Sequence, residues 1–197
     1  MKILDENYWS NKYSSDDTGW DLNGISTPLK EYFDQLTAKD LAILIPGCGS
    51  SYEAGYLLQH GFSNITLIDI SAVLCNKLRK TFHANLDKEV KVICADFFQH
   101  EGQYDLIIEQ TFFCALDPSL RKEYAAHMHQ LLKPDGKLTG VLFNRQFEGG
   151  PPFGGTEEEY RQLFEPFFEI AIMEPCYNSI KPRSGAELFI QLISKAS

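Results

Sequence analysis

LAILIPGCGSSYEAG, residues 41–55, joins an apolar run to a glycine-bearing turn and then to a segment compatible with a helix. About twenty residues after the turn, the apolar run ITLIDIS, residues 65–71, contains Asp69 near its end. A strand, a glycine turn, a helix and a second strand ending in an acid are typical of a nucleotide-binding βαβ unit. Gly47 and Gly49 would let the backbone approach a ligand, and Asp69 would accept hydrogen bonds from a ribose.

The turn differs from the dinucleotide-binding fingerprint G-x-G-x-x-G. Gly49 is followed by Ser-Ser-Tyr-Glu, so the third glycine is absent. The variant Pro-Gly-Cys-Gly favours S-adenosylmethionine (SAM) over NAD as the ligand.

Composition predicts one domain without a membrane span. The 197 residues are 44% hydrophobic and carry a net charge of −9, which disfavours binding to nucleic acid or to an anionic membrane. We find no apolar segment of about 18 residues and no apolar core of a secretion signal near the first residue. The five cysteines are scattered and never spaced C-x-x-C. They are therefore expected to be reduced thiols in a cytoplasmic protein.

Apolar runs alternate with helical patterns along the chain, which predicts a parallel sheet covered on both faces. We expect an α/β, Rossmann-like fold with a mostly parallel seven-stranded sheet and an antiparallel C-terminal pair. The expected strands are residues 41–45, 66–70, 89–96, 104–110, 137–144, 168–178 and 187–194. The expected helices are residues 28–37, 52–60, 72–85, 120–132 and 156–164, with a turn at 133–136. Residues 1–25 would form an N-terminal segment that precedes a single domain of residues 26–197.

Polar residues stand at the ends of successive expected strands, where such sheets bind ligands. Asp96 would accept from an adenine amino group while Phe97 packs on the ring, and Glu109 would face an ammonium. Each residue also has a structural interpretation, because a strand-terminal Asp often caps a helix and a phenylalanine is usually part of the core.

The sequence resembles the thiopurine S-methyltransferase family, and especially its plant-type halide/thiol methyltransferases. The resemblance covers about residues 9 to 190 and is most specific in GWD-x-x-G, PGCG and GGPPF. Other matching stretches are TGWDLNGISTPL, LIPGCGSSYEAG, LIDIS, ADFF, YDLIIEQTFFCALDPSLR, HQLLKPDGKL and FEGGPPFGG. The resemblance implies an enzyme with the class I SAM-dependent methyltransferase fold that methylates a small, soft nucleophile. In it, residues 1–25 would be an N-terminal lid and 26–197 the SAM-dependent methyltransferase domain.

The same resemblance implies a cofactor site. An aromatic lid would cover SAM, the glycine turn would line its methionine part, and the acids at the strand ends would contact the ribose, the adenine and the region of the methyl group. The implied cofactor-binding residues are Trp9, Tyr13, Trp20, Gly47, Gly49, Asp69, Ile70, Asp96, Phe97, Glu109 and Gln110.

The acceptor is less defined by the resemblance. Phe153 stands where the halide branch tends to have a tyrosine, and Gln110 where the thiopurine branch has an arginine. Phe112, Phe113, Phe143 and Phe153 would form an apolar acceptor pocket. Arg145 is a further expected acceptor residue and Arg183 a possible anion partner; surface charge is the alternative for either arginine.

We expect methyl transfer to a small thiol or thiopurine sulfur, with a halide or thiocyanate as the alternative acceptor. Two other classes stay open: an NAD-dependent oxidoreductase, disfavoured by the missing third glycine, and a SAM-binding module without turnover. No catalytic base is expected, since a thiol with a pKa of about 8.5 supplies some thiolate at neutral pH. No metal cluster is expected either. The expected partner is a small molecule, and the expected state is a monomer.

Overall fold

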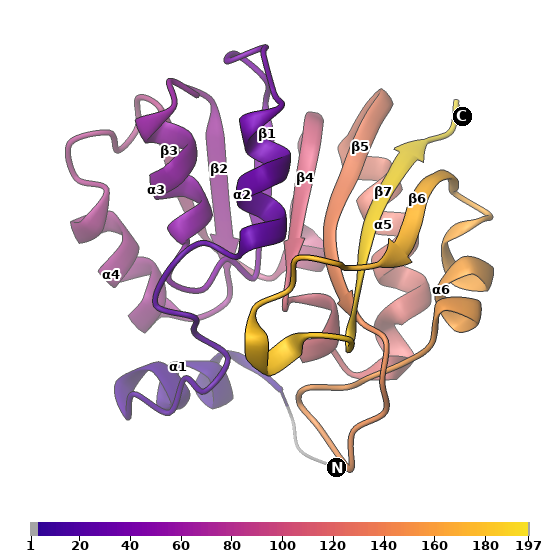
Figure 1. The fold of residues 1–197 in the computed structure, drawn as a ribbon. Helices are drawn as coiled ribbons and strands as arrows, with labels where there is room; N and C mark the ends of the chain where they lie inside the picture. Colours follow the sequence, from indigo (N-terminus) through magenta and orange to yellow (C-terminus); the bar gives the residue numbers. More distant parts are fainter. Residues whose placement is uncertain (1–3, 197) are drawn as a thin grey trace.

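The computed structural model describes residues 4–196 and shows a seven-stranded sheet in the order β3-β2-β1-β4-β5-β7-β6 (Figure 1). Neighbouring strands pair in parallel, except that β7 is antiparallel to both β5 and β6. The predicted fold, with its mostly parallel sheet and antiparallel C-terminal pair, is confirmed. The strands are β1 (Ile43–Pro46), β2 (Ile65–Asp69), β3 (Val90–Cys94), β4 (Tyr104–Gln110), β5 (Leu132–Phe143), β6 (Phe168–Pro175) and β7 (Glu187–Ser194).

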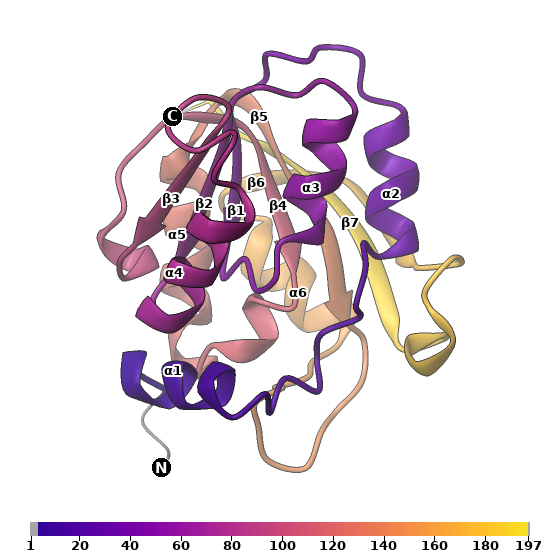
Figure 2. The same ribbon diagram turned by 90° about the vertical axis from the view of Figure 1, so that its left-hand side faces the viewer.

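Helices cover both faces of the sheet (Figure 2). The α-helices are α1 (Glu6–Ser14), α2 (Thr27–Asp34), α3 (Tyr52–Gln59), α4 (Ala72–Thr81), α5 (Arg121–Leu131) and α6 (Glu157–Phe164). Short 3-10 helices are η1 (Phe97–Gln99), η2 (Phe113–Ala115), η3 (Pro118–Leu120) and η4 (Lys181–Arg183). One core packs α2, α3 and α4 on the sheet, and the other packs α5 and α6 on the opposite face.

Strand β1 shows why the sheet needs cover on both sides. Successive side chains of a strand point to opposite faces. Ile43 and Ile45 accordingly enter the core of α2, α3 and α4, while Leu44 enters the other core. All three are buried, so the continuous apolar run in the sequence reflects burial on both faces.

Helix α1 is the main element that the sequence analysis did not predict. It buries none of its residues, so it lacks the apolar face that a sequence pattern would reveal. Asp5 caps its first turn by accepting from the Tyr8 amide at 2.9 Å. The helix lies across the end of the sheet where the parallel strands finish (Figure 1). Residues 1–3 of the expected lid and residue 197 of the expected domain lie outside the described residues.

Two element boundaries differ from the prediction by four residues or more. Helix α4 ends at Thr81, although we expected it to continue to residue 85. The expected turn at 133–136 lies inside β5, which begins at Leu132. Its turn residues still act locally, because Asp135 has a φ of 61° and the pairing with β4 shifts register between Tyr104 and Leu106. Within the described chain, no helix is both long and apolar enough to cross a membrane.

Candidate functional site

The turn after β1 requires glycine. Gly47 and Gly49 have φ values of 53° and 50°, in the left-handed region that favours glycine. A Cβ on Gly47 would also lie 2.1 Å from the ring of Phe112, so no side chain fits there. Glycine is therefore required at position 47 both by the backbone conformation and by the close approach of Phe112.

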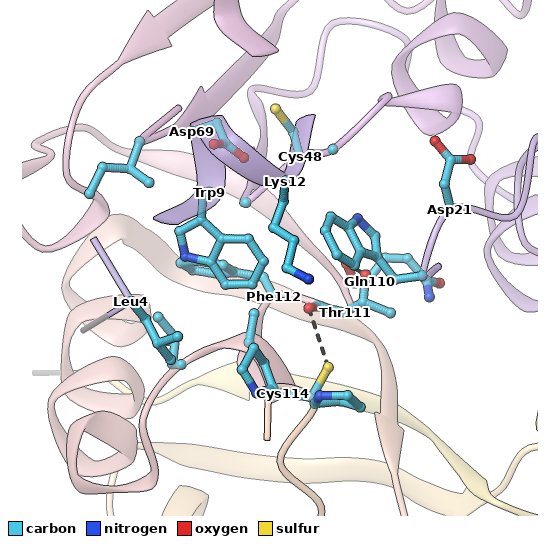
Figure 3. A pocket seen from close by; sticks show the side chains of 18 of the residues that line it. Leu4, Trp9, Lys12, Asp21, Cys48, Asp69, Gln110, Thr111, Phe112 and Cys114 are labelled. Atoms are coloured by element: carbon cyan, nitrogen blue, oxygen red, sulfur yellow. Dashed lines mark hydrogen bonds between the residues drawn. The ribbon is translucent and has the colours of Figure 1, made fainter. Parts of the chain in front are cut away.

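A cavity of about 920 Å³ lies in front of this turn. Its floor comes from the ends of β1, β2 and β4, and its cover comes from α1 and the loop that follows it. Figure 3 shows side chains from these distant segments around one space, with Trp9 and Lys12 from α1 facing Gln110, Phe112 and Cys114. Of the predicted site residues, those that line the cavity are Trp9, Tyr13, Trp20, Gly47, Gly49, Asp69, Ile70, Asp96, Phe97, Gln110 and Arg145.

Asp69 is a buried carboxyl on the cavity wall, with 8% of its surface exposed. Its Oδ1 accepts from the Ser71 amide at 2.9 Å. Burial raises the pKa of the Asp69 carboxyl to about 6. Within this pocket it is placed to accept from hydroxyl groups of a ligand, which is the chemistry of a ribose site.

Asp96 and Phe97 each combine a structural contact with a place on the cavity wall. Asp96 caps η1 by accepting from the Phe98 amide at 3.0 Å, and it lines the cavity as well. Phe97 is a core residue with 5% of its surface exposed, and its ring meets that of Phe112 edge-on at 5.1 Å. Phe97 is also part of the cavity wall.

The aromatic side chains of the N-terminal segment form one cluster over the cavity. The rings of Trp9 and Trp20 lie 5.6 Å apart at 82°, and those of Tyr13 and Trp20 lie 5.9 Å apart at 89°. Arg183 donates to the Trp20 carbonyl oxygen at 3.0 Å, which ties the cluster to the loop before β7. On the other side, Ser10 Oγ and Ser71 Oγ are 2.9 Å apart, which joins α1 to the start of α4. These polar links hold the lid without burying an α1 side chain in the core.

Glu109 does not line this cavity, which corrects the expectation that it faces an ammonium near the methyl group. It is fully buried; its Oε1 accepts from the Phe112 and Phe113 amides at 2.8 and 2.9 Å, and its Oε2 accepts from the Tyr124 hydroxyl at 2.5 Å. Glu109 and Gln110 were both expected at the methyl group. Because adjacent strand residues point to opposite faces, only Gln110 reaches the cavity.

Phe113 and Phe153 do not line the cavity either. Phe113 is 1% exposed and packs between the rings of Tyr124 and Tyr160, at 5.1 and 5.5 Å. The ring of Phe153 lies against Gly150, away from the cavity wall. The other two phenylalanines of the expected pocket, Phe112 and Phe143, do line the cavity. Other apolar residues of its wall include Leu116, Phe147, Pro151 and Pro152.

Sequence reasoning missed six charged residues of the wall, which are Asp5, Lys12, Asp17, Asp21, Glu53 and Asp117. Lys12 pairs with Asp17, and Asp21 Oδ2 accepts from the Ser50 hydroxyl at 2.5 Å. Glu53 looks in sequence like an acid that stabilises the start of α3 through the helix dipole. Its burial, with 7% of its surface exposed, is what sets it apart from such a residue.

The sequence model described as Thiopurine S-methyltransferase (TPMT) matches residues 4–189, which is most of the chain. The chain belongs to the thiopurine S-methyltransferase family. A probable thiol methyltransferase 2 of Arabidopsis thaliana is 28% identical over 94% of this chain and 85% of its own length. Thiocyanate methyltransferase 1 of Brassica oleracea is 29% identical over 94% and 84%. A thiopurine S-methyltransferase of Vibrio campbellii is 28% identical over 84% of each chain.

Solved structures support the same fold for this family member. The 1,6-didemethyltoxoflavin-N1-methyltransferase of Burkholderia thailandensis, solved with S-adenosylhomocysteine, superposes with a TM-score of 0.75 at 17% identity. It covers 97% of this chain and 87% of its own. Magnesium protoporphyrin IX methyltransferase from Synechocystis, solved with SAM, gives a TM-score of 0.72 at 14% identity over 96% and 95%. Family and fold together identify the chain as a SAM-dependent methyltransferase.

The residues of the cavity fit SAM as the cofactor. A Cβ on Gly49 would meet only the Tyr13 hydroxyl, at 3.9 Å, so the glycine turn leaves open space for a ligand at this position of the cavity wall. Two buried polar atoms on the wall, Ser51 Oγ and Gln110 Nε2, have no hydrogen-bond partner in the protein. Such atoms are costly unless a ligand or water satisfies them. A polar, partly charged ligand is therefore the expected occupant.

Proposed function

We propose that this family member transfers the methyl group of SAM to the sulfur of a small thiol or thiopurine. The carrying observation is the shape and lining of the cavity in front of the glycine turn. Its volume of about 920 Å³ is near the upper end of the usual size of small-molecule sites. One wall has the glycine turn and Asp69, and another is apolar, with Phe112, Phe143 and Phe147. The first wall therefore suits a polar cofactor, and the second suits a small apolar acceptor.

In this proposal Asp69 and Ile70 hold the ribose, Asp96 and Phe97 hold the adenine, and the glycine turn lies along the methionine part. SAM supplies a methyl group that its sulfonium has already activated. The protein's part is to align the acceptor sulfur behind that methyl and to exclude water. The aromatic cluster of Trp9, Tyr13 and Trp20 would close over the cofactor for this purpose.

The protein's own thiols at the site are kept unreactive. Cys48 and Cys114 both line the cavity and are buried. Burial raises the pKa of each thiol far above its ordinary value, so both stay protonated at neutral pH. Cys114 also donates to the Thr111 carbonyl oxygen at 3.3 Å (Figure 3). A substrate thiol with an ordinary pKa of about 8.5 would be a far better nucleophile, and no side chain has to act as its base.

A halide or thiocyanate is the second candidate acceptor, because two guanidinium groups lie on the cavity wall. Arg145 is exposed and stacks over the Phe147 ring at 4.7 Å. Arg183 donates to the Trp20 carbonyl oxygen of the lid and pairs with Glu187 at 3.4 Å. That carboxylate offsets part of its charge, which leaves Arg145 as the main attraction for an anion. We rank this candidate second, since the rest of the acceptor wall is apolar.

We also propose a cytoplasmic monomer. All five cysteines are free thiols, as a reducing compartment would keep them. Among residues 4–196, the exposed large hydrophobic side chains are Val73 and Tyr177, and the Tyr177 hydroxyl donates to Glu31 at 2.7 Å. Two separated side chains do not form an apolar patch of the size that a stable interface needs.

The test is methyl transfer from SAM to a panel of acceptors, measured by mass spectrometry. The panel contains alkyl and aryl thiols, a thiopurine, hydrosulfide, thiocyanate and iodide, with a reaction lacking protein as the control. We expect S-methylated products from the apolar thiols with the highest kcat/KM. Efficient turnover of iodide or thiocyanate without any thiol product would reverse the ranking. SAM binding without product from any acceptor would instead indicate a binding module.

A further inference from the structure

Two carboxylates face the cavity beside the glycine turn without a basic partner. Strand β1 ends in the apolar residues Ile45 and Pro46 and brings no charge to this place. Asp21 comes from the N-terminal loop and Glu53 from the first turn of α3, and both line the cavity. None of the ion pairs in the described part of the chain involves either residue.

Glu53 is the more buried of the two acids. With 7% of its surface exposed, it has lost most of its contact with water. Burial raises the pKa of the Glu53 carboxyl to about 7; amides of Glu53 and Ser26 partly offset this, and the charge of Asp21 adds to it. A buried carboxylate is costly unless a cation or several donors compensate it. A cationic group in the cavity would meet this need.

Two unused donors lie on the same wall. Ser51 is 2% exposed, and its Oγ has no partner in the protein. Gln110 Oε1 accepts from the Ser26 hydroxyl at 2.9 Å, which leaves Nε2 buried and unpaired. Gln110 lies on the same side of the cavity as Asp21 in Figure 3. The missing partner of a hydroxyl and an amide donor is an acceptor, such as a carboxylate oxygen.

The ligand that fits this wall carries a cation and an anion on neighbouring atoms. A divalent metal fits less well, since no group of three or more His, Cys, Asp or Glu side chains able to hold a metal occurs within residues 4–196. An ammonium requires fewer ligands and suits two separate carboxylates. The unpaired donors then remain for a carboxylate.

We propose that Glu53 and Asp21 bind the α-ammonium of the SAM amino-acid end, and that Ser51 and Gln110 donate to its α-carboxylate. This inference rests on the proposed function, because it takes SAM as the ligand. It assigns to the wall beside the glycine turn the recognition of an α-amino acid. Adenosine recognition, by contrast, belongs to Asp69 and Asp96.

Titration calorimetry with three ligands tests the assignment on the full chain. S-adenosylhomocysteine has both charged groups, its decarboxylated analogue keeps the ammonium alone, and 5′-methylthioadenosine has neither. The variants are Glu53→Gln, Ser51→Ala and, as the matched control, Glu101→Gln, which makes the same change at an exposed position outside the cavity. Thermal melting of each variant shows whether it is folded.

We expect Glu53→Gln to weaken S-adenosylhomocysteine and the decarboxylated analogue by about tenfold or more, while 5′-methylthioadenosine binds within about twofold of wild type. Ser51→Ala should weaken S-adenosylhomocysteine alone, and Glu101→Gln should change nothing. Equal weakening of all three ligands by Glu53→Gln, or no weakening of any, would overturn the inference. Should Glu53→Gln fail to fold, the Ser51→Ala pattern decides in the same way. Wild-type protein that binds none of the three ligands would instead contradict the proposed function.

Discussion

Replacing Glu109 by glutamine tests whether this buried acid is structural. Burial raises the pKa of its carboxyl to about 7 from a usual 4.5, even though Tyr124 and two backbone amides donate to it. The folded protein therefore binds a proton that the unfolded chain releases. Stability from this group is complete below about pH 4.5 and is lost as the pH rises through 7. With about 1.4 kcal/mol per pKa unit, the loss between pH 5.5 and pH 8 is about 2 kcal/mol.

Urea unfolding of wild type and Glu109→Gln at both pH values measures this loss. The wild-type free energy of unfolding should fall by about 2 kcal/mol more than that of the variant, since the other raised carboxyls, Glu53 and Asp69, remain in both proteins. Glu101→Gln should retain the wild-type slope. S-adenosylhomocysteine should bind Glu109→Gln within about threefold of wild type, because the carboxyl does not line the cavity. Equal pH slopes, or a loss of ligand affinity without a change in stability, would refute the structural function.

Three further predictions concern the cavity itself. Trp20→Ala should weaken S-adenosylhomocysteine by about tenfold in calorimetry with little change in melting temperature; the reverse pattern would make Trp20 a core residue. Asp69→Asn should remove the loss of ligand affinity that wild type shows as the pH falls below about 6, where the Asp69 carboxyl takes up its proton; an unchanged pH profile would argue against a ribose contact. Gly47→Ala should lower the melting temperature and abolish binding, because its Cβ would collide with Phe112 at a positive φ, whereas Gly55→Ala has open space and should be tolerated.

Most of the fold could be predicted because its strands are buried on both faces. The run around Ile43–Pro46 is apolar at every position, and such a run has few alternatives once a helix pattern follows it. Helix α1 could not be predicted in the same way, because its stability comes from the Asp5 cap and from polar contacts with α4. Those contacts depend on where α4 stands in space, which no local pattern encodes.

The candidate site divides along a similar line. Glycines and acids that end strands are local signals, and Gly47 and Asp69 both lie on the cavity wall as expected. Whether a strand-terminal side chain faces the cavity depends on a single step of the pleat, and this is why Glu109 was misjudged while Gln110 was not. Glu53 was missed because an acid in the first turn of a helix is common, and its burial becomes apparent only in three dimensions.

The hydrogen bond from Arg183 to the Trp20 carbonyl oxygen has a consequence for the order in which the protein matures. It joins residues 163 positions apart in sequence, so this contact of the lid can form only after one of the last segments has been synthesised. The glycine turn and the first strands leave the ribosome long before that tie can form. A nascent chain that stops before residue 183 lacks this tie and also β7, the strand that lies between β5 and β6. The lid and the sheet are thus completed by the same late part of the chain, so the site closes only when the fold itself is finished.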